Sequence, residues 1–136
     1  MARQHERTLR FANTQLLDHA DNAAIPDVFA EDYVVHAEGK TYRGHAFIRR
    51  WLKQLRAAIP DLRVVDVTIL AARGDTIAWR RSLAGTHKAP LKRIPPSHRK
   101  VTWNEMLVTR FDGPMIVEEW CVSELAGQLF IKQPRR

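Results

Sequence analysis

Hydrophobic residues recur with a helical period in the first half of the chain. The clearest case is residues 45–60, where apolar positions are spaced i, i+3, i+4, i+7 and i+11: Ile48, Trp51, Leu52, Leu55 and Ile59. Basic residues take the opposite side, and Pro60 ends the pattern. Residues 4–20 have a similar apolar face, and a short helix is expected from Asp21 to about Ala30.

Beyond Pro60 the apolar period falls to two, which is typical of β-strands. Residues 62–73 and 76–87 flank a Gly-Asp pair and predict a hairpin. Residues 101–111 and 115–125 flank an Asp-Gly-Pro turn and predict a second one. Residues 33–44 favour either a shorter pair of strands or a strand and a turn. Helices followed by a long antiparallel sheet indicate an α+β fold, with the helices packed on one face of the sheet.

Composition and charge narrow the class of protein. The 136 residues suit one domain, 1–136, and the sequence contains no repeat or linker. The net charge is +7, with a dense basic segment at 88–100. No aromatic RNA-binding motif, zinc finger or Gly-rich phosphate loop accompanies these charges, so we expect no nucleic-acid partner. The basic segment is either a lid whose charges attract an anionic substrate or a solvated surface loop.

The location we expect is the cytoplasm. The start of the chain lacks the apolar stretch of a secretory signal, and no apolar run approaches the roughly 20 residues of a membrane span. Cys121 is the single cysteine, so no internal disulfide can form. No Cys/His spacing resembles a zinc site, and the spacing of His36, His87 and Glu124 gives no support to a metal triad.

Four segments resemble a known family: "YRGHAFIRRWLKQLRAAIPDLRV", "ARGDTIAWRRSLAGTH", "IPPSHRKVTW" and "RFDGPMIVEEW". They are similar to the SnoaL-like polyketide cyclases, also called ester cyclases, of the NTF2-like superfamily. The resemblance implies a cone in which a curved, mostly antiparallel sheet wraps around three N-terminal helices and encloses an apolar pocket. It also implies a homo-oligomer, and ring closure by intramolecular aldol condensation of a small hydrophobic or aromatic substrate without metal or organic cofactor.

The resemblance places the acid/base carboxylate of these cyclases four residues after the Trp of the last strand. In this sequence the Trp is Trp120 and the carboxylate is Glu124, where the family usually has Asp. Strand alternation puts Glu118, Trp120 and Glu124 on one face and Glu119 on the other, toward solvent. Glu118 is either a second pocket carboxylate or, as we favour, the partner of Arg110 across the turn.

Two histidines and several aromatic residues complete the predicted site. His36 and His87 occupy positions where the family often has His, and each either relays a proton or is a hydrogen-bonded structural residue. Predicted substrate contacts are Trp51, Leu55, Trp103, Trp120, Arg110 and Glu118.

Three functions remain open on the sequence. The first is cofactor-free acid/base chemistry such as aldol cyclisation, with Glu124 as the working group. The second is ligand binding without catalysis. The third is hydrolysis or isomerisation on the same scaffold, because one fold supports many reactions.

Overall fold

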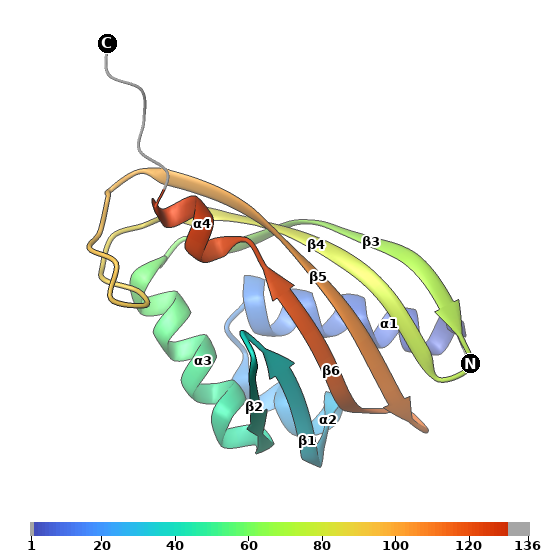
Figure 1. Ribbon diagram of the computed structural model, residues 1–136. Helices are drawn as coiled ribbons and strands as arrows, with labels where there is room; N and C mark the ends of the chain where they lie inside the picture. The colour runs from blue at the N-terminus through green and yellow to red at the C-terminus, as the bar shows by residue number, and fades with distance from the viewer. Residues whose placement is uncertain (1, 131–136) are drawn as a thin grey trace.

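The computed structural model describes residues 2–130 and contains one six-stranded sheet, in the order β2-β1-β6-β5-β4-β3 (Figure 1). The strands are β1 (Phe29–Ala37), β2 (Lys40–Arg43), β3 (Arg63–Arg73), β4 (Thr76–Thr86), β5 (Lys100–Asp112) and β6 (Met115–Ser123). All neighbours are antiparallel except β1 and β6, which run parallel. The sheet is long and curved and does not close on itself (Figure 1).

The helices cover the concave face of this sheet (Figure 1). They are α1 (Ala2–Ala12), a π-helical segment (Asn13–Asp18), a 3₁₀ turn (Asn22–Ala24), α2 (Ile25–Val28), α3 (Gly44–Ala58) and α4 (Leu125–Phe130). The apolar faces of α1 and α3 enter one hydrophobic core with the inward side chains of the strands, among them Trp79, Trp103 and Phe111. The predicted α+β cone with an NTF2-like arrangement is confirmed.

The boundaries of several elements differ from those expected. The second helix was predicted to end near Ala30, but it has four residues and β1 begins at Phe29. Pro26 favours the first turn of a helix. The helix ends early because Phe29 already pairs with Ile116 of β6. The helix α4 was not anticipated. Both long hairpins, β3–β4 and β5–β6, are as predicted.

A β-bulge in β6 decides which side chains of that strand face inward. Phe111 pairs with Ile116, but Arg110 pairs with Glu118, so Val117 is an extra residue on β6. One extra residue exchanges the two faces of a strand. Ile116 therefore points into the core, and beyond the bulge Glu119 takes the inward side in place of Glu118.

No helix within residues 2–130 is long and apolar enough to cross a membrane.

Candidate active site

An internal cavity of about 130 Å³ lies between the helices and the concave face of the sheet. Apolar side chains form most of its wall, among them Leu9, Leu16, Phe29, Trp51, Leu107 and Ile116. Three charged side chains from adjacent strands also line it: Arg81 of β4, Glu105 of β5 and Glu119 of β6. A few convergent polar groups in an apolar pocket are typical of a small-molecule site.

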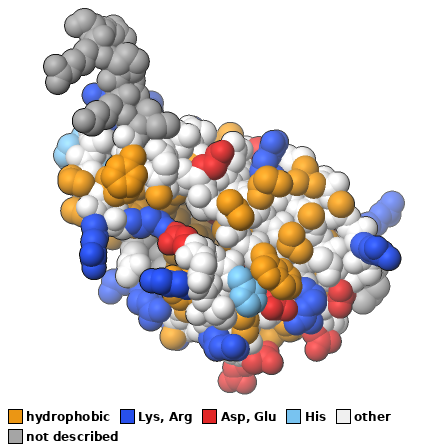
Figure 2. All heavy atoms as spheres, in the orientation of Figure 1, with side chains coloured by type: hydrophobic (Ala, Val, Ile, Leu, Met, Phe, Trp, Pro, Cys, Tyr) orange, Lys and Arg blue, Asp and Glu red, His pale blue; other side chains and the backbone are white. Residues whose placement is uncertain are grey.

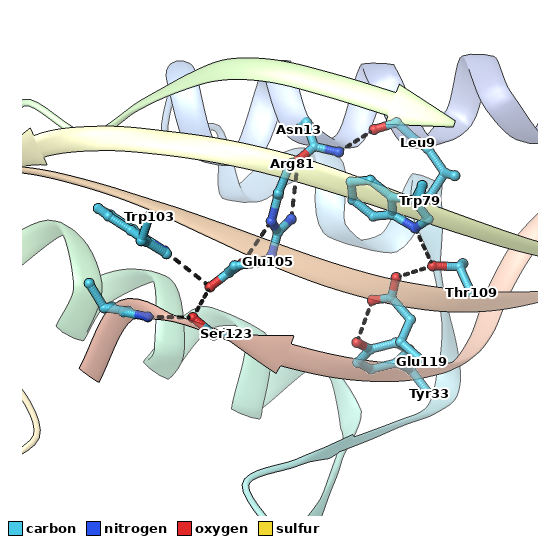
Figure 3. Close-up of polar contacts among 11 residues, drawn as sticks. Leu9, Asn13, Tyr33, Trp79, Arg81, Trp103, Glu105, Thr109, Glu119 and Ser123 are labelled. Carbon is cyan, nitrogen blue, oxygen red and sulfur yellow. Dashed lines mark hydrogen bonds and ion pairs between the residues drawn. The ribbon is translucent and has the colours of Figure 1, made fainter. Parts of the chain in front are cut away.

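Glu119 contributes a carboxyl group to the cavity wall, and it is 6% exposed. Tyr33 Oη donates a hydrogen bond to its Oε1 at 2.7 Å, and Thr109 Oγ1 donates to its Oε2 at 2.5 Å (Figure 3). The indole Nε1 of Trp79 donates to Thr109 Oγ1 at 2.8 Å. Because an indole N–H can only donate, the one hydroxyl proton of Thr109 is directed at Glu119. Each carboxylate oxygen keeps a second lone pair for another donor.

The surroundings of Glu119 make it a candidate acid/base group. Burial raises the pKa of its carboxyl above the ordinary value, and the hydrogen bonds from Thr109 and Tyr33 only partly oppose that rise. Burial, with Glu119 nearby, raises the pKa of Tyr33 well above its usual range, so its hydroxyl stays a donor. A carboxyl whose pKa moves toward neutrality can both accept and return a proton.

Arg81 and Glu105, which also line the cavity, form a buried ion pair (Figure 3). The Nε of Arg81 lies 2.8 Å from Glu105 Oε1, and its side chain is 10% exposed. Ser123 Oγ and Trp103 Nε1 donate to Glu105 Oε2 at 2.7 and 3.2 Å. Burial opposes ionisation of Glu105, but Arg81 and these donors prevail and hold the pKa of the carboxyl below its ordinary value. Glu105 is therefore ionised at neutral pH.

The guanidinium of Arg81 is also held from the helical side. Its Nη1 donates to Asn13 Oδ1 at 3.1 Å, and Asn13 Nδ2 donates to the carbonyl of Leu9 at 2.7 Å (Figure 3). Asn13 begins the π-helical segment, a distortion that is frequent at functional sites. The rings of Trp51 and Trp79 lie 5.8 and 5.4 Å from the guanidinium carbon, which is within cation–π range.

Cys121 lies on the cavity wall, one inward position beyond Glu119. Burial, with the nearby carboxylate of Glu105, raises the pKa of its thiol to about 12. The thiol is therefore protonated and unsuited to nucleophilic attack.

Comparison with known proteins identifies the family. The sequence profile of the SnoaL-like polyketide cyclases matches residues 6–130. The chain belongs to this family. A search of curated protein sequences found no match.

Several solved structures share the fold. AclR of Streptomyces galilaeus, a candidate hydroxylase, is 24% identical, with a TM-score of 0.76 over 95% of this chain and 96% of its own. A candidate polyketide cyclase of Acidithiobacillus ferrooxidans is 24% identical, with a TM-score of 0.78 over 92% and 91%. IdmH of Streptomyces antibioticus, a candidate polyketide cyclase, is 22% identical, with a TM-score of 0.77 over 93% and 96%. At these identities the likeness concerns the fold alone.

The structure places Glu124, the carboxylate predicted from the family resemblance, outside the cavity. Its side chain is exposed, and its Oε1 accepts a hydrogen bond from the backbone N–H of Asn104 at 3.1 Å. The predicted burial of Glu124 is wrong, and so is the prediction that Glu119 faces solvent. Both errors have one cause: the apolar residues Trp120 and Val122 indicate the wrong face of β6, since beyond the bulge at Val117 they lie outside and Glu119 lies inside.

Four other residues that the sequence assigns to the site also lie outside the cavity. Glu118 accepts from Arg110 Nη2 at 3.1 Å, which confirms the ion pair and excludes the alternative of a pocket carboxylate. His36 Nε2 lies 2.7 Å from Glu118 Oε2, and its ring stacks on Trp120 at 5.3 Å. Trp120 is 41% exposed. His36, Trp120, Arg110 and Glu118 therefore form a cluster on the outer face of the sheet, where they cannot line the inner cavity.

The other predicted residues are divided between cavity and core. Trp51 lines the cavity as expected, whereas Leu55 lines a neighbouring groove. Trp103 is buried and does not line the cavity. It donates a hydrogen bond to Glu105, which does. His87 is fully buried after β4 and does not line the cavity; its two ring nitrogens have no hydrogen-bond partner among residues 2–130.

The residues that the structure describes do not meet the requirements of a metal site. Among residues 2–130 no group of three or more His, Cys, Asp or Glu side chains is close enough together to hold an ion. His36, His87 and Glu124 lie on the outer face, in the core and at the end of β6 respectively.

Sequence reasoning missed Glu119, Glu105, Arg81, Asn13, Tyr33 and Thr109. The alternation of β5 carried a usable signal, because Trp103, Leu107 and Phe111 share a face with Glu105 and Thr109. A polar residue at alternating positions within an apolar face indicates a buried polar group that requires partners.

Proposed function

We propose that this protein catalyses cofactor-free acid/base chemistry on a small carbonyl compound, such as intramolecular aldol cyclisation, with Glu119 as the proton-transferring group. The observation that carries the proposal is a buried carboxyl in the cavity, held by Tyr33 and Thr109, with a pKa raised by burial. Membership of the cyclase family supports the reaction class.

The reaction needs one proton to leave and one to return. Ionised Glu119 removes a proton from the carbon next to a carbonyl group, and the resulting enolate carbon attacks a second carbonyl of the same molecule. A carbon–carbon bond forms, and the new alkoxide takes the proton back from Glu119. The product is an isomer of the substrate, and the carboxylate is regenerated.

Arg81 supplies positive charge to the same cavity. Two of its five N–H groups go to Glu105 and one to Asn13. We assign the remaining donors to the carbonyl oxygen on which the enolate charge develops, because a fixed donor at that point stabilises the transition state. Its ion pair and the two Trp rings keep the guanidinium in place.

The proposal can be tested without the natural substrate. We would incubate acetophenone with the protein in D₂O and follow exchange of its methyl protons by NMR, because exchange requires only enolisation. The wild type should accelerate exchange, and Glu119→Gln should lower the rate about 100-fold or more, as general acid–base groups contribute that much. Glu124→Gln is the matched control and should exchange like the wild type.

Each outcome of this experiment has a clear reading. A loss confined to Glu124→Gln would transfer the acid/base role to Glu124. Exchange by the wild type at the buffer rate would favour a binding domain over an enzyme. If the proposal holds, the rate should rise with pH through an inflection above 4.5, the ordinary value for a Glu carboxyl.

We also propose that the protein is a homo-oligomer, associated through the outer face of the sheet. Four apolar side chains there are 37–73% exposed: Met106, Val108, Trp120 and Val122. They are adjacent, since Met106 pairs with Val122 and Val108 with Trp120. Figure 2 shows hydrophobic side chains gathered over β5 and β6 on this face. A contiguous exposed apolar patch is typical of an interface.

Light scattering after size-exclusion chromatography tests this association. Val122→Lys should shift the protein toward the monomer. Phe11→Lys, at a residue 46% exposed on α1, is the control and should leave the mass unchanged. A monomeric wild type would contradict the proposal.

A further inference from the structure

Two hollows meet at the mouth of the cavity. The inner cavity of about 130 Å³ adjoins an outer groove of about 320 Å³ between α3, the β1–β2 turn and the basic loop. Six residues line both hollows: Ala37, Glu38, Phe47, Trp51, Lys92 and Leu125. The two spaces are therefore adjacent, and these side chains line the passage at which they meet.

The volume of the inner cavity limits what it can hold. A cavity of roughly 150 Å³ accommodates one benzene molecule, and ligand pockets usually span about 300–1,000 Å³. The inner cavity therefore has room for about one ring beside Glu119. Any larger ligand must extend through the passage into the outer groove.

An ion pair between Lys92 Nζ and Glu38 Oε1 crosses this passage. Lys92 and Arg93 are the central residues of a tight turn closed by Leu91 and Ile94, and both have positive φ, 51° and 64°. Glu38 has a φ of 56° in the β1–β2 turn. These are uncommon conformations for residues other than glycine, and such strain clusters at ligand-binding sites. Two strained turns thus bring their charged side chains together over the mouth.

The outer groove has a second cation and a flat aromatic wall. Arg50 lines it, and within residues 2–130 Arg50 makes no ion pair. The guanidinium of Arg50 lies 5.7 Å from the ring of Phe47, which stacks on Tyr42 with 4.4 Å between ring centroids. The groove therefore has an excess of positive charge, because Lys92 and Arg50 line it together with a single carboxylate, that of Glu38.

From this arrangement we infer that the mouth is a carboxylate subsite, and that the ligand is an aromatic ketone acid whose ring lies in the inner cavity and whose carboxylate binds Lys92 and Arg50. This inference rests on the proposed function, since it places the ketone beside Glu119. On binding, Lys92 exchanges Glu38 for the ligand carboxylate. The exchange costs little, because the side chains of Lys92 and Glu38 are 35% and 59% exposed and exposed ion pairs are weak.

Calorimetric titration with two matched probes tests the subsite. The probes are 4-acetylbenzoate, which carries the anion, and 4-acetylbenzamide, its neutral isostere. The wild type should bind the benzoate at least 10-fold more tightly. Lys92→Met should remove that preference, whereas Glu38→Gln should increase it about threefold or more by removing the competing carboxylate. Both changes should leave affinity for the benzamide within twofold.

Two further variants test whether the preference depends on overall charge and whether it depends on the proposed function. Arg63→Met removes an equal charge at an exposed position on β3, outside both hollows, so it should keep the preference for the benzoate. Glu119→Gln should also keep the preference even if proton exchange is lost. Equal binding of the two probes by the wild type, or a preference that survives Lys92→Met, would overturn the subsite. If Arg63→Met also lost the preference for the benzoate, that preference would come from the net charge of the protein and not from a subsite.

Discussion

Replacing Glu119 by Gln should stabilise the protein increasingly as the pH rises, whereas the same change at Glu105 should destabilise it. Both carboxyl groups are buried on the inner face of the sheet, at 6% and 4% exposure. Their pKa values move in opposite directions: burial prevails at Glu119 and raises its pKa, and Arg81 prevails at Glu105 and lowers its pKa.

The expected size at Glu119 follows from proton linkage. Below pH 4.5 its carboxyl is protonated in both folded and unfolded chains, and the wild type and the amide variant should be similar. Above 4.5 the unfolded chain ionises first, which lowers the stability of the wild type by about 1.4 kcal/mol per pH unit. The loss levels off at the raised pKa of folded Glu119. Above that pH Glu119→Gln should be the more stable protein.

At Glu105 the effect of ionisation on stability has the opposite sign. Its ionised form stabilises the fold above pH 4.5, and this contribution disappears as the pH falls through the lowered pKa of the folded state. At pH 7, Glu105→Gln leaves Arg81 charged, buried and without its partner, which should cost about 3–5 kcal/mol. The deficit relative to the wild type should shrink on acidification.

Urea unfolding at pH 4, 5, 6, 7 and 8, followed by Trp fluorescence, measures both differences. The free energy of unfolding of each variant is compared with that of the wild type at the same pH. A stability difference for Glu119→Gln that does not change with pH would refute the raised pKa. Parallel pH profiles for the two variants would refute the opposite electrostatic roles of the two carboxyl groups.

Three further changes test other parts of the structure. Thr109→Val removes a donor to Glu119, so the pKa of that carboxyl should rise further and the pH inflection of acetophenone exchange should move upward; an unchanged inflection would contradict the hydrogen bond. Gly85→Ala would place a Cβ against Ile59 Cγ2 in the core, and it should lower the free energy of unfolding by about 1–3 kcal/mol. Urea unfolding measures this change, and an unchanged stability would show that the core rearranges to accept the methyl group. Tyr33→Phe removes the other donor to Glu119, and NMR titration of that carboxyl should show a higher pKa than in the wild type.

Most helices and strands of this protein could be predicted from local patterns in the chain. The amphipathic period of α3 and the alternating residues around the Gly-Asp and Asp-Gly-Pro turns are local signals, and local signals specify helices and hairpins. Family resemblance supplied the arrangement of these elements around an apolar pocket. The charged side of α3 and the ion pair of Arg110 with Glu118 were also predictable, since both follow from spacing along an element or across a turn.

Which carboxyl group enters the cavity depends on contacts between distant strands. Strand alternation allows two faces, and the apolar residues Trp120 and Val122 indicated the wrong one because both are exposed on the outside. The choice was made by one extra residue, Val117, where pairing with β5 shifts register. Beyond that bulge Glu119 can enter the core because Tyr33 and Thr109, from two other strands, satisfy its oxygens. The pattern of β6 alone does not reveal these partners, because they come from distant parts of the chain.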